Sequence, residues 1–452
     1  MNVMKAVILA AGEGKRMKSK LPKVLHKIQG RTMIDYVIDS AEEAGADGIC
    51  VVIGNQWEEV KKNLANRNVE FAIQKEQRGT GHAVMQAKDF IGENADIVVL
   101  YGDTPLVKAE TIDKLLDFHR KAGNSISIIS AIVENPEGYG HIIRDENGNF
   151  LKNIEHKDAD EVQKSVKEIN TGIYCFTSDA LKIGLSLLKN DNAQGEYYLP
   201  DTLEIILSKG GKVNAMIADS TEEFFGVNSR SQLAEASAVM RKRINYGHMD
   251  NGVTLVDPER TYIDAGVKIG MDTILMPGAV LEGDTEIGED CIVGPDSRLT
   301  SVKLGNRVKF QYSTAINSSV GDDTTVGPYA YIRPDCEIGA NVKIGDFVEV
   351  KNSNIGDGTK VSHLTYIGDS DVGERINFGC GTVTVNYDGN KKFRTIIDDD
   401  VFIGCNTNLI APVKVGKNSY IAAGSTITDD IPDDCFAIAR ERQTNKKGWI
   451  KN

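Results

Sequence analysis

Aliphatic residues recur every six positions through most of the second half of the chain, from Ile263 to Ile427. Long runs with this spacing begin at Ile263, Val320 and Ile397, and a shorter run begins at Ile355 after a slip of one residue. A small or β-branched residue often lies four positions after the aliphatic residue, and glycine often follows it directly. An α-helix cannot use this period, because six residues are neither one turn nor two.

The six-residue period predicts a parallel β-helix. Each hexad would form one flat side with its aliphatic residue pointing inward, and three sides would close a triangular coil of about eighteen residues. Coils would stack about 4.8 Å apart, and about two dozen hexads would make roughly eight coils. We expect the glycine after each aliphatic residue to occupy a corner where φ is positive. A β-sandwich is disfavoured, because it requires two-residue alternation and frequent turn clusters.

The first half of the chain alternates strand-like and helix-like segments, which predicts an α/β unit with a mostly parallel sheet and helices on both faces. Residues 135–155 have the pattern of an inserted hairpin, and residues 170–176 that of a further strand. The strand-like segments are Ala6–Leu9, Ile49–Ile53, Val69–Ile73, Ile97–Leu100 and Ser125–Ala131. The helix-like segments are Thr32–Ala44, Trp57–Ala65, Thr80–Phe90 and Ala109–Arg120.

A long segment without glycine or proline, residues 229–245, predicts a helix that connects the two halves. We therefore expect a Rossmann-like domain at residues 1–228, a linker helix at 229–250 and an all-β β-helix domain at 251–452. The tail beyond Asp433 is basic and lacks hexads.

Composition narrows the functional classes. The formal net charge of −13 disfavours nucleic acids and anionic membranes as partners. The seven cysteines are scattered and form no CxxC, which predicts reduced thiols in the cytoplasm, without a disulfide framework or a zinc site. No apolar run is long enough to span a membrane, and the apolar start before Gly12 is too short for a signal peptide.

A loop with glycines and cations follows the first predicted strand, at the sheet edge where ligands bind. Gly12 and Gly14 let backbone N–H groups approach an anion, and Arg16 and Lys23 add positive charge. A tight turn with solvated cations explains the loop alone equally well. A dinucleotide-binding fingerprint is disfavoured, because no acidic residue ends the next strand.

The loop Leu9–Met17 with the following Pro22-Lys23 resembles the signature of sugar-1-phosphate nucleotidyltransferases. With the six-residue repeats, nearly the whole chain is similar to the family of bifunctional N-acetylglucosamine-1-phosphate uridylyltransferases and glucosamine-1-phosphate acetyltransferases. The resemblance implies a left-handed β-helix and a homotrimer along its axis, with acetyl-transfer sites at the subunit borders. Further matching motifs are Gln74, 77–82, Tyr101–Asp103, Gly138–Gly140, Glu155–Lys157, Asn170–Gly172 and Gly226–Asn228.

The resemblance implies that the first domain transfers UMP from UTP to N-acetylglucosamine-1-phosphate. The phosphate nucleophile is already ionised, so the reaction needs positioning and charge neutralisation. Asp103 suits Mg²⁺ held largely by substrate phosphates, and the resemblance implies Asn228 as its second ligand. Helix capping by Asp103 is the alternative, and ordinary strand-end polarity is the alternative for Glu155 and Asn170. The implied nucleotide-sugar contacts are Leu9, Ala10, Ala11, Gly12, Arg16, Lys23, Gln74, Gly79, Thr80, Tyr101, Gly102, Asp103, Gly140, Glu155, Asn170 and Asn228.

A second candidate site lies on the predicted β-helix. Arg333 and Lys351 are eighteen residues apart, so they should stack on consecutive coils and favour an anion such as a sugar phosphate. Screening by solvent and by carboxylates such as Glu349 is the alternative. His363 should project outward and suits a general base. No other histidine follows His248, which excludes a zinc site of the carbonic anhydrase type with three imidazoles.

The resemblance implies that His363 takes the proton from the amine of glucosamine-1-phosphate as that amine attacks acetyl-CoA. Cys380 and Cys405 depart from the alanine and serine that the family pattern leads us to expect. A nucleotidyltransferase with a regulatory β-helix is the alternative function, and a binding or structural protein is disfavoured by the two sites together. The implied sugar-phosphate contacts are Arg333, Lys351, Tyr366 and Asn377. The implied acetyl-CoA contacts are Cys380, Asn386, Tyr387, Cys405, Ala423 and Arg440.

Overall fold

The computed structural model describes residues 3–54, 56–192, 194–447 and 449. Contacts divide the chain into two compact units, Met1–Met240 and Arg241–Asn452, each with hydrophobic core of its own. Helix α9 (Arg230–Asp250) contains the division and covers the predicted linker helix. The expected domain limits at residues 228 and 250 stay a prediction.

The first unit contains a sheet with the strand order β11-β7-β10-β6-β1-β4-β5. Its neighbours are parallel except for β10, which runs antiparallel to both β6 and β7. The predicted, mostly parallel sheet is therefore confirmed. The strands are β1 (Val3–Ala10), β4 (Gly48–Ile53), β5 (Glu70–Ile73), β6 (Ala95–Tyr101), β7 (Ile126–Ile132), β10 (Glu168–Thr177) and β11 (Val213–Ile217).

Helices cover both faces of this sheet, as β1 shows. Val7 and Leu9 belong to one apolar core, whereas the alternating residues Ala6 and Ile8 belong to another. This alternation follows from the two-residue period of a strand. The helices are α1 (Met33–Glu43), α2 (Trp57–Asn63), α3 (Thr80–Met85), α4 (Lys88–Ile91), α5 (Ala109–Ala122), α6 (Glu161–Lys164), α7 (Ser178–Leu187) and α8 (Asp201–Ser208).

Two predicted elements of the first unit are found with altered limits. The helix expected at residues 80–90 is divided into α3 and α4. The hairpin expected within residues 135–155 consists of β8 (His141–Arg144) and β9 (Phe150–Ile154), which pair antiparallel.

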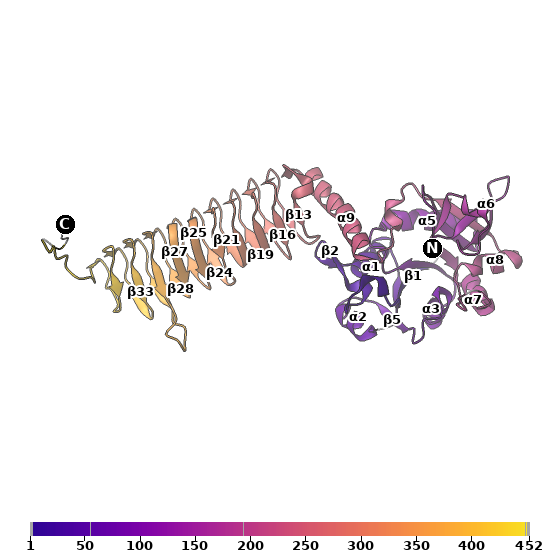
Figure 1. Ribbon diagram of the computed structural model, residues 1–452, viewed down its shortest axis with the longest axis horizontal. Coiled ribbons are helices and arrows are strands. Elements are labelled where there is room, and N and C mark those ends of the chain that lie inside the picture. The colour runs from indigo at the N-terminus through magenta and orange to yellow at the C-terminus, as the bar shows by residue number, and fades with distance from the viewer. Residues whose placement is uncertain (1–2, 55, 193, 448, 450–452) are drawn as a thin grey trace. The chain divides into compact units, whose positions relative to one another are not determined.

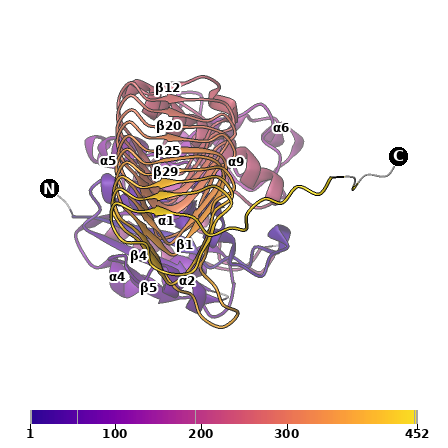
Figure 2. The same ribbon diagram turned by 90° about the vertical axis from the view of Figure 1, so that its left-hand side faces the viewer.

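The second unit is a parallel β-helix, as predicted. Its described strands, β12 (Thr254–Leu255) to β37 (Phe436–Ala437), form one 26-stranded sheet. The coils lie over one another when viewed along the stack (Figure 2). The six-residue aliphatic positions line the core; Ile332, Val350 and Ile367, for example, are partners in consecutive coils and are each 0% exposed. Strands used below are β23 (Tyr331–Ile332), β25 (Lys343–Lys351), β27 (Lys360–Gly368), β29 (Asn377–Phe378), β30 (Val383–Val385), β31 (Thr395–Ile397), β32 (Phe402–Ile403) and β35 (Tyr420–Ile421).

The expected role of the repeated glycines was confirmed at Gly294 (φ 98°) and Gly327 (φ 103°) but was wrong at the other hexad glycines that the structure describes. Positive φ falls three residues after the aliphatic position, as at Asp323 (59°) and Asn341 (56°), and not at Gly321 or Gly339. A Cβ added to Gly321 would lie 2.7 Å from the backbone nitrogen of Ala340 in the next coil. Glycine is therefore required there by the close approach of consecutive coils. Asp and Asn occupy many of the left-handed corners, but large residues such as Tyr329 and Phe347 occupy some of them as well.

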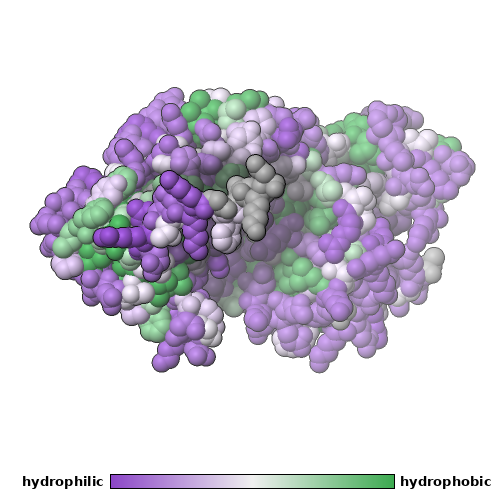
Figure 3. Space-filling model, turned by 60° about the vertical axis from the view of Figure 1, so that its left-hand side comes forward, coloured by the Kyte–Doolittle hydropathy of each residue, from purple (hydrophilic) through white to green (hydrophobic). Residues whose placement is uncertain are grey.

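Two segments interrupt or end the coils. Residues 386–394 form a loop between β30 and β31 that projects from the stack (Figure 1), as the lapse in hexads predicted. Beyond Asp433, β37 adds one more pairing to β35 before the chain leaves the coils. No helix in the described part of the chain is long and apolar enough to cross a membrane. On the face shown in Figure 3, hydrophilic residues predominate and apolar residues form separate patches.

Candidate active sites

A pocket of about 340 Å³ opens at the carboxyl ends of β1 and β6, where parallel sheets bind ligands. Ten predicted contacts line it together with five further residues. Gly102 supports the pocket by donating its N–H to the carbonyl of Leu9 (2.9 Å), but Arg16 is exposed and lies outside the lining. A larger hollow of about 800 Å³ beside α5 and β11 holds none of the predicted contacts. The lining residues are Leu9, Ala10, Ala11, Gly12, Lys23, Val24, Gln74, Gln77, Gly79, Thr80, Ala83, Tyr101, Asp103, Glu196 and Tyr198.

Asp103 and Asn228 converge on one cation. The Lys23 ammonium donates to Asn228 Oδ1 at 2.9 Å and forms an ion pair with Asp103. The backbone N–H of Val227 donates to the carbonyl of Asp103 (2.9 Å) and fixes the two loops together. The two acceptor oxygens that hold this ammonium are the ligand type that Mg²⁺ prefers. Among the described residues, no group of three or more His, Cys, Asp or Glu side chains could hold a metal.

The predicted uracil contacts lie at one end of the pocket. Gln74 is buried, and its amide nitrogen donates to the carbonyl of Gly79 (3.2 Å) and lies 3.1 Å from His82 Nδ1. Thr80 Oγ1 accepts from the N–H of Leu199 (3.1 Å). Gly79 has φ of 100°, so this turn favours glycine and brings backbone groups against the pocket.

The predicted sugar contacts form a second group behind Tyr101. The N–H of Asn170 donates to the carbonyl of Gly140 (2.8 Å), and the Asn170 side chain donates to Asn153 Oδ1 (3.1 Å). Burial raises the pKa of the Glu155 carboxyl, against a hydrogen bond from Asn153 that lowers it. Burial, with the charges of Asp103 and Glu155, likewise raises the pKa of Tyr101. Asn153 was missed by the sequence analysis, because strand alternation alone does not distinguish it from its neighbours.

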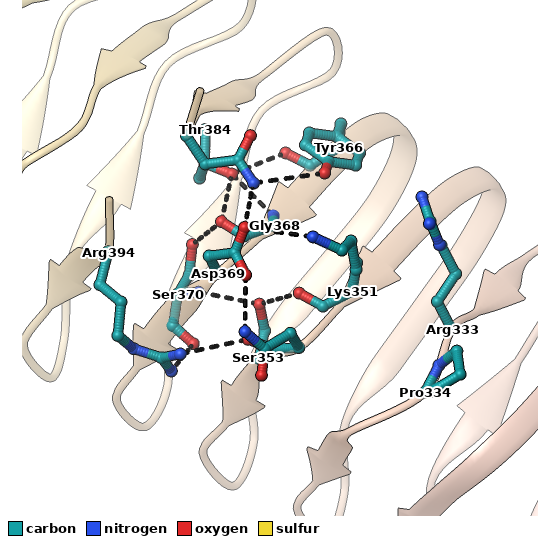
Figure 4. Close-up of polar contacts among 12 residues, drawn as sticks. Arg333, Pro334, Lys351, Ser353, Tyr366, Gly368, Asp369, Ser370, Thr384 and Arg394 are labelled. Atoms are coloured by element: carbon teal, nitrogen blue, oxygen red, sulfur yellow. Dashed lines mark hydrogen bonds and ion pairs between the residues drawn. The ribbon is translucent and has the colours of Figure 1, made fainter. Parts of the chain in front are cut away.

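Arg333 and Lys351 stack on consecutive coils, as predicted from their spacing. The partners Ile332 and Val350 align β23 with β25, and the N–H of Arg333 donates to the carbonyl of Val350 (2.8 Å). Each cation also has a carboxylate: Arg333 pairs with Glu349 (2.9 Å), and Lys351 pairs with the buried Asp369 (3.3 Å). Figure 4 shows Lys351 directed at Asp369, with Arg333 on the neighbouring coil. The carboxylate screening weighed as an alternative is thus present.

A third cation at this site was missed by the sequence analysis. Lys392 lies on the projecting loop, and a side-chain hydrogen bond with Lys351, together with the like charge of Lys351, lowers the pKa of Lys392. Arg333, Lys351 and Lys392 outnumber Glu349 and Asp369, so the cluster keeps a positive excess that can hold an anion. The proximity of Lys392 depends on the path of the loop, which hexad spacing does not encode.

The two adjacent loop residues predicted to contact acetyl-CoA have different surroundings. Asn386 is buried and donates to Asp369 and to the hydroxyl of Tyr366 (3.5 Å), so it belongs with the cation cluster. Tyr387 is exposed, and its hydroxyl donates to the carbonyl of Gly389 (2.6 Å). Asn377 starts β29 and is half-buried at the outer surface of the β-helix.

His363 is exposed and lies beside a carboxylate on the preceding coil. Its Nδ1 is 2.7 Å from Oδ1 of Asp346, its partner in the alignment of β25 with β27. This hydrogen bond lowers the pKa of the Asp346 carboxyl. An ionised carboxylate only accepts, so Nδ1 carries a proton, and in the neutral imidazole Nε2 keeps a lone pair for a substrate. Asp346 was missed. The one-residue slip before Ile355 shortens this coil, so Ile344 aligns with Val361 and Asp346 with His363.

Three predicted coenzyme contacts occupy one column. Asn377, Phe402 and Tyr420 are partners in consecutive coils. Cys380, Cys405 and Ala423 each follow three residues later and are exposed. Arg440 joins them, because a Cβ on Gly424 would lie 3.8 Å from its Cδ.

Comparison with known proteins agrees with both units. The nucleotidyl transferase family profile matches residues 5–231, and the bacterial transferase hexapeptide profile matches residues 266–301, 317–352 and 394–429. The "Bifunctional protein GlmU" of Caldanaerobacter subterraneus subsp. tengcongensis is 54% identical over 100% of this chain and 98% of its own length. The protein of the same name from Clostridium kluyveri is 55% identical over 98% of each chain. That from Clostridioides difficile is 52% identical over 99% of this chain and 97% of its own.

A nucleotide pocket on an α/β sheet and a cationic site on a hexapeptide β-helix define a two-site transferase. The chain is more than 50% identical to these relatives over nearly its full length, which identifies one family within this class. The chain belongs to the GlmU family of bifunctional proteins. Enzymes of this family are uridylyltransferases and glucosamine-1-phosphate acetyltransferases, and their nucleotidyltransferase unit uses a divalent metal.

Proposed function

We propose that the two units catalyse two successive reactions of UDP-N-acetylglucosamine synthesis, each with the side chains of its own site. The second unit acetylates glucosamine-1-phosphate with acetyl-CoA, and the first unit transfers UMP from UTP to the product, releasing pyrophosphate. The presence of two chemically distinct sites on separate units, one beside Asp103 and one beside His363, is the observation that carries this proposal.

In the first unit, the sugar phosphate oxygen attacks the α-phosphorus of UTP in line. Gln74 and the Gly79 turn hold the uracil, and Glu155 and Asn170 accept and donate hydrogen bonds to the amino sugar. The Lys23 ammonium, which contacts Asp103 and Asn228, would stabilise the charge that develops on the phosphates in the transition state. No general base is required, because the nucleophile is already ionised.

Mg²⁺ fits the residues around Lys23. Asp103 and Asn228 would hold it, as the convergence of their oxygens on the Lys23 ammonium supports. The ion would neutralise phosphate charge, with water and substrate oxygens completing its coordination. Lys23 then has only to rotate its ammonium toward the phosphates.

In the second unit, Arg333, Lys351 and Lys392 hold the sugar phosphate, and Tyr366, Asn377 and Asn386 orient the sugar. Nε2 of His363 takes the proton from the substrate amine as that amine attacks the thioester carbonyl. Asp346 holds the imidazole in the required tautomer and stabilises it once charged. The coenzyme extends past Tyr387, Cys380, Cys405, Ala423 and Arg440.

The assembly and location are also proposals. An exposed ladder of Tyr312, Tyr329 and Phe347, with ring centroids 5.8 and 5.6 Å apart, supports side-by-side packing into a homotrimer. The soluble metabolite substrates and the unpaired cysteines support a cytoplasmic location. We infer a nucleotidyltransferase domain at 1–228, a linker helix at 229–250 and an acetyltransferase domain at 251–452.

One incubation tests this assignment. The protein is mixed with glucosamine-1-phosphate, acetyl-CoA, UTP and Mg²⁺, and the products are separated by mass. UDP-N-acetylglucosamine should form only when all components are present. If acetylation fails while supplied N-acetylglucosamine-1-phosphate is still joined to UTP, the β-helix is a scaffold, and the single-activity alternative replaces the proposal.

A further inference from the structure

Six of the seven cysteines are either fully buried or exposed, and Cys435 is half-buried. Cys50, Cys175, Cys291 and Cys336 are buried, and burial raises the pKa of each thiol, for Cys50 to about 12. Such thiols are poor nucleophiles at neutral pH and are shielded from reagents. Cys380 and Cys405, in contrast, are both exposed on the β-helix.

These two exposed thiols are neighbours on consecutive coils. β29 and β32 pair Asn377 with Phe402 and Phe378 with Ile403, and Cys380 and Cys405 each follow two residues after the second pair. The alignment continues that far, because the N–H of Asn406 donates to the carbonyl of Cys380 (2.7 Å). The side chains therefore leave the same surface side by side.

The coil spacing suits a reversible bond between them. Neighbouring parallel strands lie about 4.8 Å apart, within the range of about 4.4–6.8 Å between Cα atoms that a disulfide spans. Their parallel Cα–Cβ bonds keep the Cβ atoms near the same 4.8 Å, slightly wider than the usual 3.5–4.5 Å. A disulfide there needs a small local shift, which makes it easy to reduce again.

We propose that Cys380 and Cys405 form a dithiol site that a peroxide oxidises to a disulfide. The Cys380 thiol loses its proton, and its sulfur displaces hydroxide from the peroxide, forming an S–O bond; the hydroxide takes up the proton and leaves as water. Cys405 sulfur then attacks the Cys380 sulfur, the S–S bond forms and the oxygen leaves as a second water. Two electrons pass from the thiols to the peroxide, and a dithiol reductant reverses the change.

His363 provides a base beside this pair. β27 and β29 pair Lys360 with Asn377 and Val361 with Phe378, so His363 precedes Cys380 in the same column. Its Nε2 lone pair, kept free by the Asp346 hydrogen bond, can accept the thiol proton. Oxidation should therefore begin at Cys380 and be resolved by Cys405.

A disulfide in this column would act on acetyl transfer, and this consequence rests on the proposed function. The two sulfurs would draw together beside His363 and reshape the surface along which acetyl-CoA extends. The nucleotide pocket of the first unit contains neither residue, so uridylyl transfer should be unchanged.

The test treats the full chain with limiting hydrogen peroxide and maps disulfides by mass spectrometry without reduction. We expect a cross-linked peptide joining Cys380 and Cys405, loss of most acetyl transfer, full recovery with dithiothreitol and unchanged uridylyl transfer. Cys380→Ala and Cys405→Ser should both lack the cross-link. Oxidation of Cys405→Ser should stop at a sulfenic acid on Cys380, and Cys380→Ala, compared with its own untreated activity, should also lack the reversible loss. Cys435→Ser, which changes a half-buried thiol outside the pair, should behave as the parent.

Two results would overturn the proposal. Separate sulfenic acids without the cross-linked peptide would show that the thiols do not meet. A cross-link that leaves acetyl transfer unchanged would remove its regulatory role. Absence of acetyl transfer before oxidation would instead contradict the proposed function. In that case, detection of the Cys380–Cys405 peptide by mass spectrometry would still show whether the two thiols form a disulfide.

Discussion

At the scale of single residues, each site joins groups from distant parts of the sequence. Lys23 and Asn228 are 205 positions apart, yet their side chains meet beside Asp103. Motif resemblance identified all three residues, but their mutual geometry depends on how β1, β6 and the segment before α9 come together. The contact of Asn153 with Asn170 and that of Lys392 with Lys351 could not be predicted, because only the folded chain brings these side chains together.

Asp103→Ala should abolish uridylyl transfer and its Mg²⁺ dependence. The substitution removes the carboxylate that contacts the Lys23 ammonium together with Asn228 and that we propose as a Mg²⁺ ligand. Acetyl transfer should stay near normal. Asp219→Ala, which removes an exposed surface carboxylate of the same unit, is the matched control. Normal formation of UDP-sugar by the Asp103 variant would disprove the metal assignment.

Glu155 should make sugar binding depend on pH. Burial raises the pKa of this carboxyl, so it takes up a proton at a higher pH than an ordinary glutamate does. As pH falls, the KM for N-acetylglucosamine-1-phosphate should rise more steeply in the parent than in Glu155→Gln, whose amide does not titrate. The substrate phosphate titrates equally in both assays, so the difference between the two pH profiles of KM reports the titration of Glu155 alone. Identical pH profiles would place Glu155 outside the sugar site.

At the scale of elements, the hexad period predicted the β-helix and the stacking of Arg333 on Lys351, since both follow from counting residues per coil. It did not predict what the glycines do, because a six-residue period does not show how closely consecutive backbones approach. The same counting would have found Asp346 from His363 only with the one-residue slip before Ile355 taken into account. The six-residue period could not predict the path of loop 386–394, because that segment has no repeat.

Gly321→Ala should destabilise the β-helix by about 1–3 kcal/mol, because its Cβ would press on backbone atoms of the next coil, which cannot move independently. Gly266→Ala is the matched control in the same unit, since its nearest neighbour would be 3.6 Å away. Denaturant unfolding of the two variants measures the difference. Equal stabilities would show that the coils are less closely packed than described.

At the scale of the whole molecule, the exposed aromatic ladder predicts association. Tyr329 and Phe347 are 57% and 60% exposed, which leaves apolar surface that packing between subunits would cover. We expect a homotrimer by light scattering or native mass spectrometry, and partial dissociation in Phe347→Asp. Lys268→Asp is the control, because Lys268 lies in the same unit but far in sequence from Tyr329 and Phe347. This variant should leave the mass of the assembly unchanged. A monomer at micromolar concentration with full acetyl transfer would contradict this assembly.

The central claim is that one chain carries two chemically independent transferase sites, each within its own unit. Substitutions without shared partners should act independently, and loss of a general base lowers a rate by about 10²–10⁴-fold. Measuring both reactions on His363→Ala tests this most directly. The rate of glucosamine-1-phosphate acetylation should fall by that factor and recover in part at higher pH. Supplied N-acetylglucosamine-1-phosphate should still be joined to UTP at the normal rate. Normal acetylation at neutral pH, or a parallel fall of both activities, would contradict the central claim.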